Sequence, residues 1–177
     1  MTAHVMIDIE SMDAAPTAVV LSIGLVLFNP YEPDAPIQGS YWVVDTEEQD
    51  IGGRTRSAET AQWWAEQSPE ARTVLTAEGE PVDRVLKQLL SVVRSDEVEH
   101  VWANGPDFDC VILADLTRGR GPWPFWKNRC YRTIKSLALP KTYVKPARGG
   151  THHNALDDAL HQARDLQARV KALGLRF

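Results

Sequence analysis

Apolar and polar residues alternate in the first part of the chain, which predicts a strand-rich start. Residues 5–10 alternate between two faces of a predicted strand. Val5, Ile7 and Ile9 share one face, whereas Met6, Asp8 and Glu10 share the other. Branched apolar residues predict a second strand at 18–28, and a third is expected at 41–44. The connections are short enough for an antiparallel meander, with a proline-containing loop at 29–39.

The remainder of the chain shows helical spacing of apolar residues. Residues 81–94 predict a helix with Pro81 at its start, and a long amphipathic helix is expected from Asn154 onward. Shorter helices are expected at 57–67 and 69–75, with Ser57 and Ser68 as their N-caps. Further along, we expect a strand at 101–103, a helix at 108–117, and a short strand or helix at 131–139. Residues 120–128 are expected to be irregular, and 141–152 to form a loop. Three strands followed by alternating helices and strands predict an α/β fold with a mixed sheet flanked by helices.

Length and composition are those of an ordinary globular protein. The chain has 177 residues, of which 44% are hydrophobic and 24% charged, so we expect a single domain over residues 1–177. The longest apolar run, 18–28, is too short to span a bilayer, and no secretory signal is visible at the start. Two cysteines form no disulfide framework. These features predict a cytoplasmic protein that is not associated with a membrane.

Charge is distributed unevenly along the chain. The net charge is −5, but residues 116–156 contain nine basic residues and no acidic one, so the rest of the chain carries −14. Five aromatic residues are interleaved with these cations, a mixture that suits a path for single-stranded nucleic acid. On composition alone, a solvated basic face over a few buried aromatics is the better explanation. The basic residues are Arg118, Arg120, Lys127, Arg129, Arg132, Lys135, Lys141, Lys145 and Arg148.

Asp8 and Glu10 are unusual residues for an early apolar strand. They lie two positions apart, so both carboxylates leave the same face of the strand. Two buried carboxylates repel each other unless a cation lies between them, and a hard divalent ion such as Mg²⁺ or Mn²⁺ is the natural partner of oxygen ligands. A strand end at which both acids reach water explains the pair equally simply.

Two further acidic clusters each lie at the start of a predicted helix. Asp109 follows Asn104 after the short strand, and Asp158 lies in the first turn of the last helix. An acidic residue is favoured at either position by the helix dipole and the free amide groups, so each cluster has an ordinary structural explanation. Asp107 and Asp157 are adjacent acids that the pattern alone does not exclude.

Taken in order, these clusters match a known set of motifs. Asp8-Ile9-Glu10, the segment 63–72 with its sequence WWAEQSPEAR, the segment 104–113 with its sequence NGPDFDCVIL, and His153 five residues before Asp158 stand at the expected spacing. The sequence resembles the DEDDh 3′–5′ exonucleases of the ribonuclease T and DnaQ-like kind, and most closely the ribonuclease T-like exoribonuclease group with phage and bacterial members. The resemblance covers essentially the whole chain and implies an RNase H-like fold.

The resemblance implies an enzyme that hydrolyses single-stranded RNA or DNA from its 3′ end and releases nucleoside 5′-monophosphates, with RNA favoured. It implies two divalent metal ions, Mg²⁺ or Mn²⁺, and His153 rather than His152 as the residue that takes a proton from the attacking water, a role suited to its ordinary pKa of about 6.5. The four metal-binding acids that it implies are Asp8, Glu10, Asp109 and Asp158. Of the neighbouring acids, Asp109 is preferred over Asp107.

Several residues are candidates for contacts with the substrate. Residues directly after Glu10 would border the terminal nucleotide, and basic residues of the long loop would guide its phosphates. These candidates are Ser11, Met12, Asn104, Lys141, Lys145 and Arg148. Trp63 and Trp64 are expected to pack in the interior rather than to stack on bases. The alternative function is a nucleic-acid-binding module of the same fold without turnover, and a homodimer remains open as the assembly.

Overall fold

A five-stranded mixed sheet lies at the centre of the structure, a computed structural model that describes residues 3–119 and 121–177. The strands lie in the order β3-β2-β1-β4-β5. Their bounds are β1 (Ala3–Ser11), β2 (Val20–Phe28), β3 (Gln38–Val43), β4 (Val98–Ala103) and β5 (Asn128–Cys130). β1, β2 and β3 form the antiparallel meander, whereas β4 is parallel to β1 and β5 is parallel to β4. Arg120, counted above among the basic residues, lies outside the described residues.

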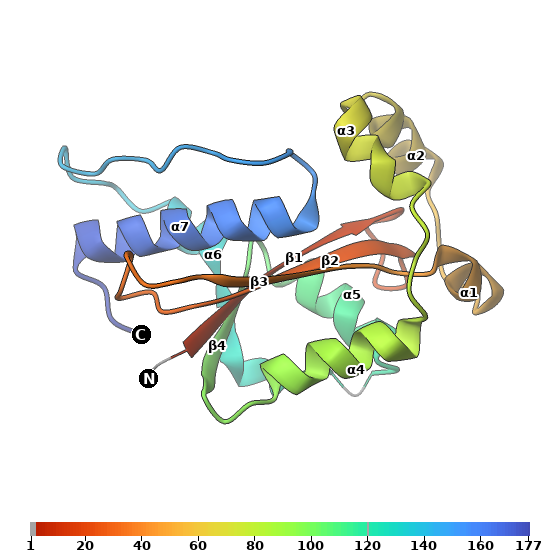
Figure 1. Cartoon of the computed structure of the whole chain (residues 1–177), viewed down its shortest axis with the longest axis horizontal. Coiled ribbons are helices and arrows are strands. Elements are labelled where there is room, and N and C mark those ends of the chain that lie inside the picture. Colours follow the sequence, from red (N-terminus) through yellow and green to blue (C-terminus); the bar gives the residue numbers. More distant parts are fainter. Residues whose placement is uncertain (1–2, 120) are drawn as a thin grey trace.

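Helices cover both faces of this sheet (Figure 1). α6 (Tyr131–Lys135) and α7 (Ala155–Leu173) pack on one face, and α4 (Val82–Val93) and α5 (Asp109–Leu116) pack on the other. The segment between α6 and α7 runs back alongside α7 to reach its first turn (Figure 1). The other helices are α1 (Thr46–Ile51), α2 (Ala58–Ala65), α3 (Pro69–Arg72) and the 3₁₀ turns η1 (Thr73–Leu75) and η2 (Phe125–Lys127). Among the described helices, none combines the length and the apolar character that a membrane crossing requires.

Alternation along β1 decides which residues are core and which face the site. Val5, Ile7 and Ile9 pack with the apolar faces of α4 and α5. Met6 belongs to the core on the opposite face, which α7 covers. Because Asp8 and Glu10 follow Met6 at two-residue intervals, their side chains leave the sheet on the side of α7.

The start of α7 lies directly against β2 at Gly24. Gly24 is the pairing partner of Asp8, and a Cβ added to Gly24 would lie 2.1 Å from the backbone carbonyl carbon of Ala155. A side chain at this position therefore cannot coexist with the present position of α7. The glycine allows the first turn of α7, with Asp158, to lie beside the acids of β1.

Most of the elements expected from the sequence are present. The meander, the mixed sheet, the helix within 81–94 and the long last helix are confirmed. Ser57, Ser68 and Asn154 accept hydrogen bonds from backbone N–H groups at the starts of α2, α3 and α7, as expected of N-caps. The sequence allows either a strand or a helix within 131–139, and the structure has a helix there, α6 (Tyr131–Lys135). The third strand begins at Gln38, inside the expected loop, because its pairing with β2 extends to that residue.

The 3₁₀ turn η2, β5 and α1 have no counterpart in the sequence prediction. β5 contains three residues, too few to show a period, and it is fixed by its parallel pairing with β4. Its first residue, Asn128, is the last of the segment 120–128 that the sequence predicts to be irregular. α1 is a short polar helix whose cap, Asp45, accepts hydrogen bonds from the N–H groups of Glu47 and Glu48. Its six residues show no apolar face from which a helix could be predicted.

Candidate active site

Side chains from widely separated parts of the chain line one cavity of about 460 Å³. β1 contributes two acids from the middle of the sheet, α5 one acid at its first residue, and α7 one acid from its first turn. The loop before α7 contributes two histidines, His152 and His153. The structure thus brings together the five side chains that the motifs single out: Asp8, Glu10, Asp109, His153 and Asp158.

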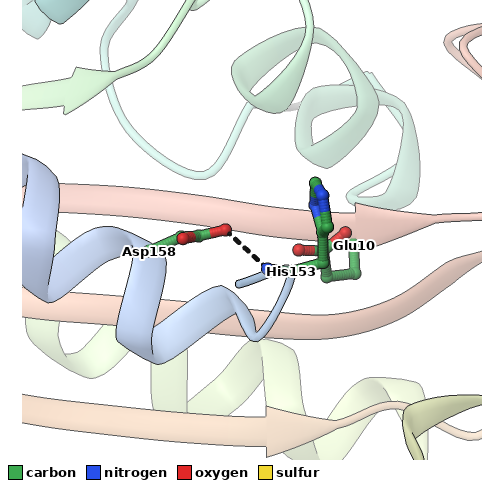
Figure 2. Close-up of side chains that lie close together, drawn as sticks. All are labelled: Glu10, His153 and Asp158. Atoms are coloured by element: carbon green, nitrogen blue, oxygen red, sulfur yellow. Dashed lines mark hydrogen bonds between the residues drawn. The ribbon is translucent and has the colours of Figure 1, made fainter. Parts of the chain in front are cut away.

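Backbone hydrogen bonds fix two of these acids. The N–H of Ile9 donates to Oδ1 of Asp109 over 3.1 Å, which joins the start of α5 to β1. The N–H of His153 donates to Oδ2 of Asp158 over 3.1 Å, the dashed line in Figure 2. Glu10, His153 and Asp158 each place a possible ligand atom within 4.8 Å of the other two.

Burial and mutual repulsion raise the pKa values of three carboxyl groups in the cavity. Burial first, and the nearby Asp109 second, raise the pKa of Glu10 to about 8. Burial raises the pKa of Asp109 to about 7. The pKa of Asp8 lies well above its ordinary value because the group is desolvated and faces both of the other acids. Carboxylates so arranged ionise together only when a cation compensates their charge.

The donor set fits a hard divalent ion. Four carboxyl groups supply oxygen ligands only, which is the preference of Mg²⁺ and Mn²⁺. Burial raises the pKa values of Glu10 and Asp109, so a cation bound between these carboxyl groups would favour their ionised forms. The cavity therefore has the chemistry of a metal-binding acidic cluster.

His153 has an uncommon backbone conformation and a crowded ring. Its φ of 63° lies in the left-handed region, which few residues other than glycine adopt. The ring packs edge-on against those of His152 and Trp63, with centroid distances of 4.0 and 4.7 Å. Burial, together with the nearby His152 and Arg148, lowers the pKa of His153 to about 4. The pKa of His153 is thus lower than the ordinary value expected from the sequence, and the ring is neutral at pH 7.

Three of the substrate-binding candidates are not among the described residues that line the cavity. Ser11 and Met12 are buried beyond Glu10: the Ser11 carbonyl accepts a hydrogen bond from Nε1 of Trp64 over 2.9 Å, and Met12 packs in the same cluster as Trp64. Lys141 is exposed on the long loop. Their expected contacts with substrate remain predictions.

The other three candidates do line the cavity. They are Asn104, Lys145 and Arg148. The Asn104 carbonyl accepts a hydrogen bond from Nη2 of Arg132 over 2.8 Å, and Arg132 lines the cavity as well. Arg148 forms an ion pair with Asp158. The cavity wall therefore carries positive charge beside its acids.

The two acids that the sequence left open lie elsewhere. Asp107 is exposed, and Asp157 accepts a hydrogen bond from the N–H of Thr151 over 2.7 Å. Neither is among the described residues of the cavity wall. Asp109 and Asp158 therefore line the cavity and the two neighbouring acids do not, while the role of Asp109 and Asp158 in binding metal remains a prediction.

Two residues near the acids were missed or misjudged by sequence reasoning. Nε2 of Gln162 donates to Oδ1 of Asp8 over 2.7 Å. Gln162 follows Asp158 by four residues, so helical spacing alone placed it on the same face of α7 and could have indicated it. Trp64 is buried as expected, but Trp63 is 39% exposed and its ring contacts His153. No sequence pattern reveals that contact.

A family model described as the 3′–5′ exoribonuclease Rv2179c-like domain matches residues 3–170. The chain belongs to this family. The match includes all five motif residues of this Rv2179c-like domain. The chain is also 26% identical over 198 aligned positions to a protein of Enterobacteria phage T4 named exodeoxyribonuclease, and the alignment covers 94% of this chain and 87% of the phage protein.

Solved structures show the same fold as this Rv2179c-like domain. Pop2p of S. pombe, in a form described as Mg²⁺ and Mn²⁺ bound, superposes with a TM-score of 0.62 at 18% identity, covering 94% of this chain and 82% of Pop2p. The cell-death related nuclease 4, CRN-4, gives a TM-score of 0.60 at 17% identity, covering 98% of this chain and 65% of CRN-4. The RNase H-like fold and the resemblance to DEDD-type exonucleases are confirmed, and the domain is a 3′–5′ exonuclease by family.

Proposed function

We propose that this domain is an exonuclease of the DEDDh type, which removes nucleoside 5′-monophosphates from the 3′ ends of single-stranded nucleic acid, with RNA favoured, by using two divalent metal ions. The observation that carries the proposal is the meeting of four acids and one histidine from separate motifs in one cavity. A domain that only binds nucleic acid gains nothing from buried carboxylates that repel one another and the phosphates.

The chain's own residues would share the work as follows. Asp8, on the central strand, would hold the divalent ions together with Glu10, Asp158 and Asp109. Glu10 and Asp158, which lie beside His153, would serve the attacking water, and Asp109 would serve the departing 3′ oxygen. When bound, Mg²⁺ or Mn²⁺ activates water and stabilises the departing oxygen. His153, whose ring is neutral at pH 7, would accept the proton of the attacking water.

Basic residues of the cavity wall support a role in holding the strand. Lys145, Arg148 and Arg132 lie on the same cavity as the acids, so a phosphate near the acids would also face these cations. Arg148 would then exchange its carboxylate partner, Asp158, for the substrate. Neutralisation of the acids by metal would remove the repulsion that otherwise opposes binding of phosphate.

RNA is the favoured substrate because the family model that covers the chain is described as an exoribonuclease domain. The phage relative is named an exodeoxyribonuclease, so DNA belongs in the same test. Discrimination between the two requires a contact with the 2′-hydroxyl of RNA.

The deciding experiment follows digestion of matched RNA and DNA oligonucleotides, labelled at the 5′ end, in Mg²⁺ or Mn²⁺. We expect a ladder that shortens from the 3′ end, faster for RNA, and no ladder in EDTA or with Asp8→Ala. Binding without shortening would contradict the exonuclease and support the binding module. Equal rates on the two oligonucleotides would contradict only the preference for RNA.

A further inference from the structure

Gln162 makes a direct contact with the acid at the centre of the site. It lies on α7, one turn after Asp158, and its side chain is only 7% exposed. Its Nε2 donates to Oδ1 of Asp8 over 2.7 Å, a bond between residues 154 positions apart in the chain. In this contact the nitrogen end of the Gln162 amide faces Asp8, and Oδ1 of Asp8 accepts, because an amide nitrogen only donates hydrogen bonds.

The hydrogen bond restricts the carboxylate of Asp8. Asp8 lies on β1 in the middle of the sheet, and the carboxyl groups of Asp109 and Glu10 repel its carboxylate. Without a hydrogen bond, this repulsion would favour rotation of the Asp8 side chain away from them. A buried donor on α7 holds Oδ1 in place and leaves Oδ2 of Asp8, which lines the cavity, outside this hydrogen bond. Metal-binding side chains are commonly oriented in this way by partners that do not touch the metal.

The other half of the amide indicates that Gln162 serves more than stability. Its Oε1 is buried and has no hydrogen-bond partner among the residues that the structure describes. A buried acceptor without a partner lowers stability, so an apolar residue of similar size would serve the fold as well or better. The hydrogen bond to Asp8 is therefore the feature that this glutamine supplies.

We propose that Gln162 is a positioning residue of the acidic cluster, which holds the Asp8 carboxylate in the orientation that binds divalent ions. This role rests on the proposed function, because only a nuclease would use the bound ions for catalysis. Its direct consequence, a change in the affinity of the acidic cluster for divalent metal, can be measured without activity. The proposal assigns to α7 a second task besides presenting Asp158.

Gln167 offers a matched control on the same helix. It is also a buried glutamine, but its Nε2 donates to the carbonyl groups of Asn29 and Glu32, over 2.8 and 3.3 Å, away from the cavity. Its replacement removes an equivalent amide without touching Asp8. Loss of Gln167 leaves two carbonyl groups without this donor and is expected to lower the melting temperature.

The experiment measures Mn²⁺ binding by electron paramagnetic resonance or calorimetry, without nucleic acid, in the whole chain. For Gln162→Leu we expect a Kd that is higher by roughly ten- to a hundredfold, with a smaller fall in melting temperature than in Gln167→Leu. Gln162→Asn, too short to reach Asp8, should behave in the same way. Gln167→Leu should keep the Kd of the unmodified chain while it loses more stability.

The outcomes separate the two proposals. An unchanged Kd in Gln162→Leu and Gln162→Asn, or an equal rise in Gln167→Leu, would overturn the positioning role even if the unmodified chain degrades RNA. A selective rise in Kd in a chain that degrades neither RNA nor DNA would support the positioning role and contradict the exonuclease. In an active enzyme, the variants should need more metal for half-maximal rate and keep the KM for the strand.

Discussion

The protonation of Glu10 and Asp109 makes the stability of this protein sensitive to pH. Folded Glu10 and Asp109 keep their protons up to pH values of about 8 and 7. In the unfolded chain the same groups lose them near pH of about 4. Between these limits the folded state binds more protons than the unfolded state, so these groups make stability fall as pH rises. His153, with its pKa lowered to about 4, acts in the opposite direction, but only below its unfolded pKa of about 6.5.

The expected result is a melting temperature, measured in EDTA, that falls between pH 7 and pH 9. Glu10→Gln should flatten this decline, because the amide cannot lose a proton. Mg²⁺ should raise the melting temperature most at pH 9, where the carboxylates are ionised and the ligand binds only the folded state. Calorimetry with and without metal measures both effects, and a melting temperature that rises with pH in EDTA would contradict the assignment.

Trp63 provides a test of what holds the His153 ring. The ring of Trp63 packs against that of His153, so removal of the Trp63 ring should let His153 leave the position that the proposed mechanism requires. We expect Trp63→Ala to lower kcat by roughly ten- to a hundredfold. Trp126→Ala is the control, since Trp126 is also an exposed tryptophan but lies at η2, outside the cavity wall formed by the described residues. Steady-state kinetics would contradict the role if both variants lost the same activity.

At the level of the elements, the approach of α7 to β2 determines where Asp158 lies. Gly24→Ala would place a methyl group against the backbone of Ala155, and α7 would have to shift. We expect a free energy of unfolding lower by about 1–3 kcal/mol, as is typical of overpacking, and weaker binding of Mn²⁺. Gly149→Ala is the matched control, because nothing lies within 4 Å of its added Cβ. Equal stability of the two variants in chemical denaturation would show that the contact at Gly24 can relax.

The elements also show which parts of the fold can be read from the sequence. β1 and α7 were predictable because their apolar residues recur with the period of a strand and of a helix. The N-cap of α7 was predictable because asparagine is a usual side chain there. β5 and α1 are short and are held by pairing and capping contacts rather than by an apolar face. Such elements depend on tertiary structure, which local patterns do not contain.

The sequence predicts which acids belong to the candidate site, but it does not predict which side chains contact the site residues. The order and spacing of the motifs indicated Asp8, Glu10, Asp109 and Asp158, because these residues can be read directly from the sequence. The contact of Trp63 with His153 and the lowered pKa of that histidine arise only when α2 and the loop before α7 meet. Ser11 and Met12 illustrate the converse, since nearness in sequence to Glu10 does not place them on the cavity wall.

Across the whole molecule, the uneven charge distribution should make strand binding depend on salt. The basic segment, residues 116–156, includes Lys145 on the cavity wall and Lys141 outside it. Charge reversal at these two lysines is therefore expected to change strand binding to different extents. We expect Lys145→Glu to raise KM for a single strand roughly tenfold, equivalent to about 1.4 kcal/mol, and to reduce the dependence of KM on salt. Lys141→Glu should have a smaller effect.

Lys87→Glu, on α4 across the sheet, is the control for the change in net charge alone. Kinetics at several salt concentrations distinguish the cases. The guiding role would be wrong if Lys87→Glu and Lys145→Glu raised KM equally, because the effect would then reflect total charge rather than position.

The left-handed backbone at His153 also determines how an inert form of the enzyme should be made for trapping a bound strand. Valine or isoleucine there would disturb the turn itself, so that the loss of turnover would be mixed with a misplaced loop and a displaced Asp158. Asparagine tolerates this conformation better than most residues and cannot serve as an equivalent base. His153→Asn is therefore the substitution most suited to capturing an intact complex for crystallography.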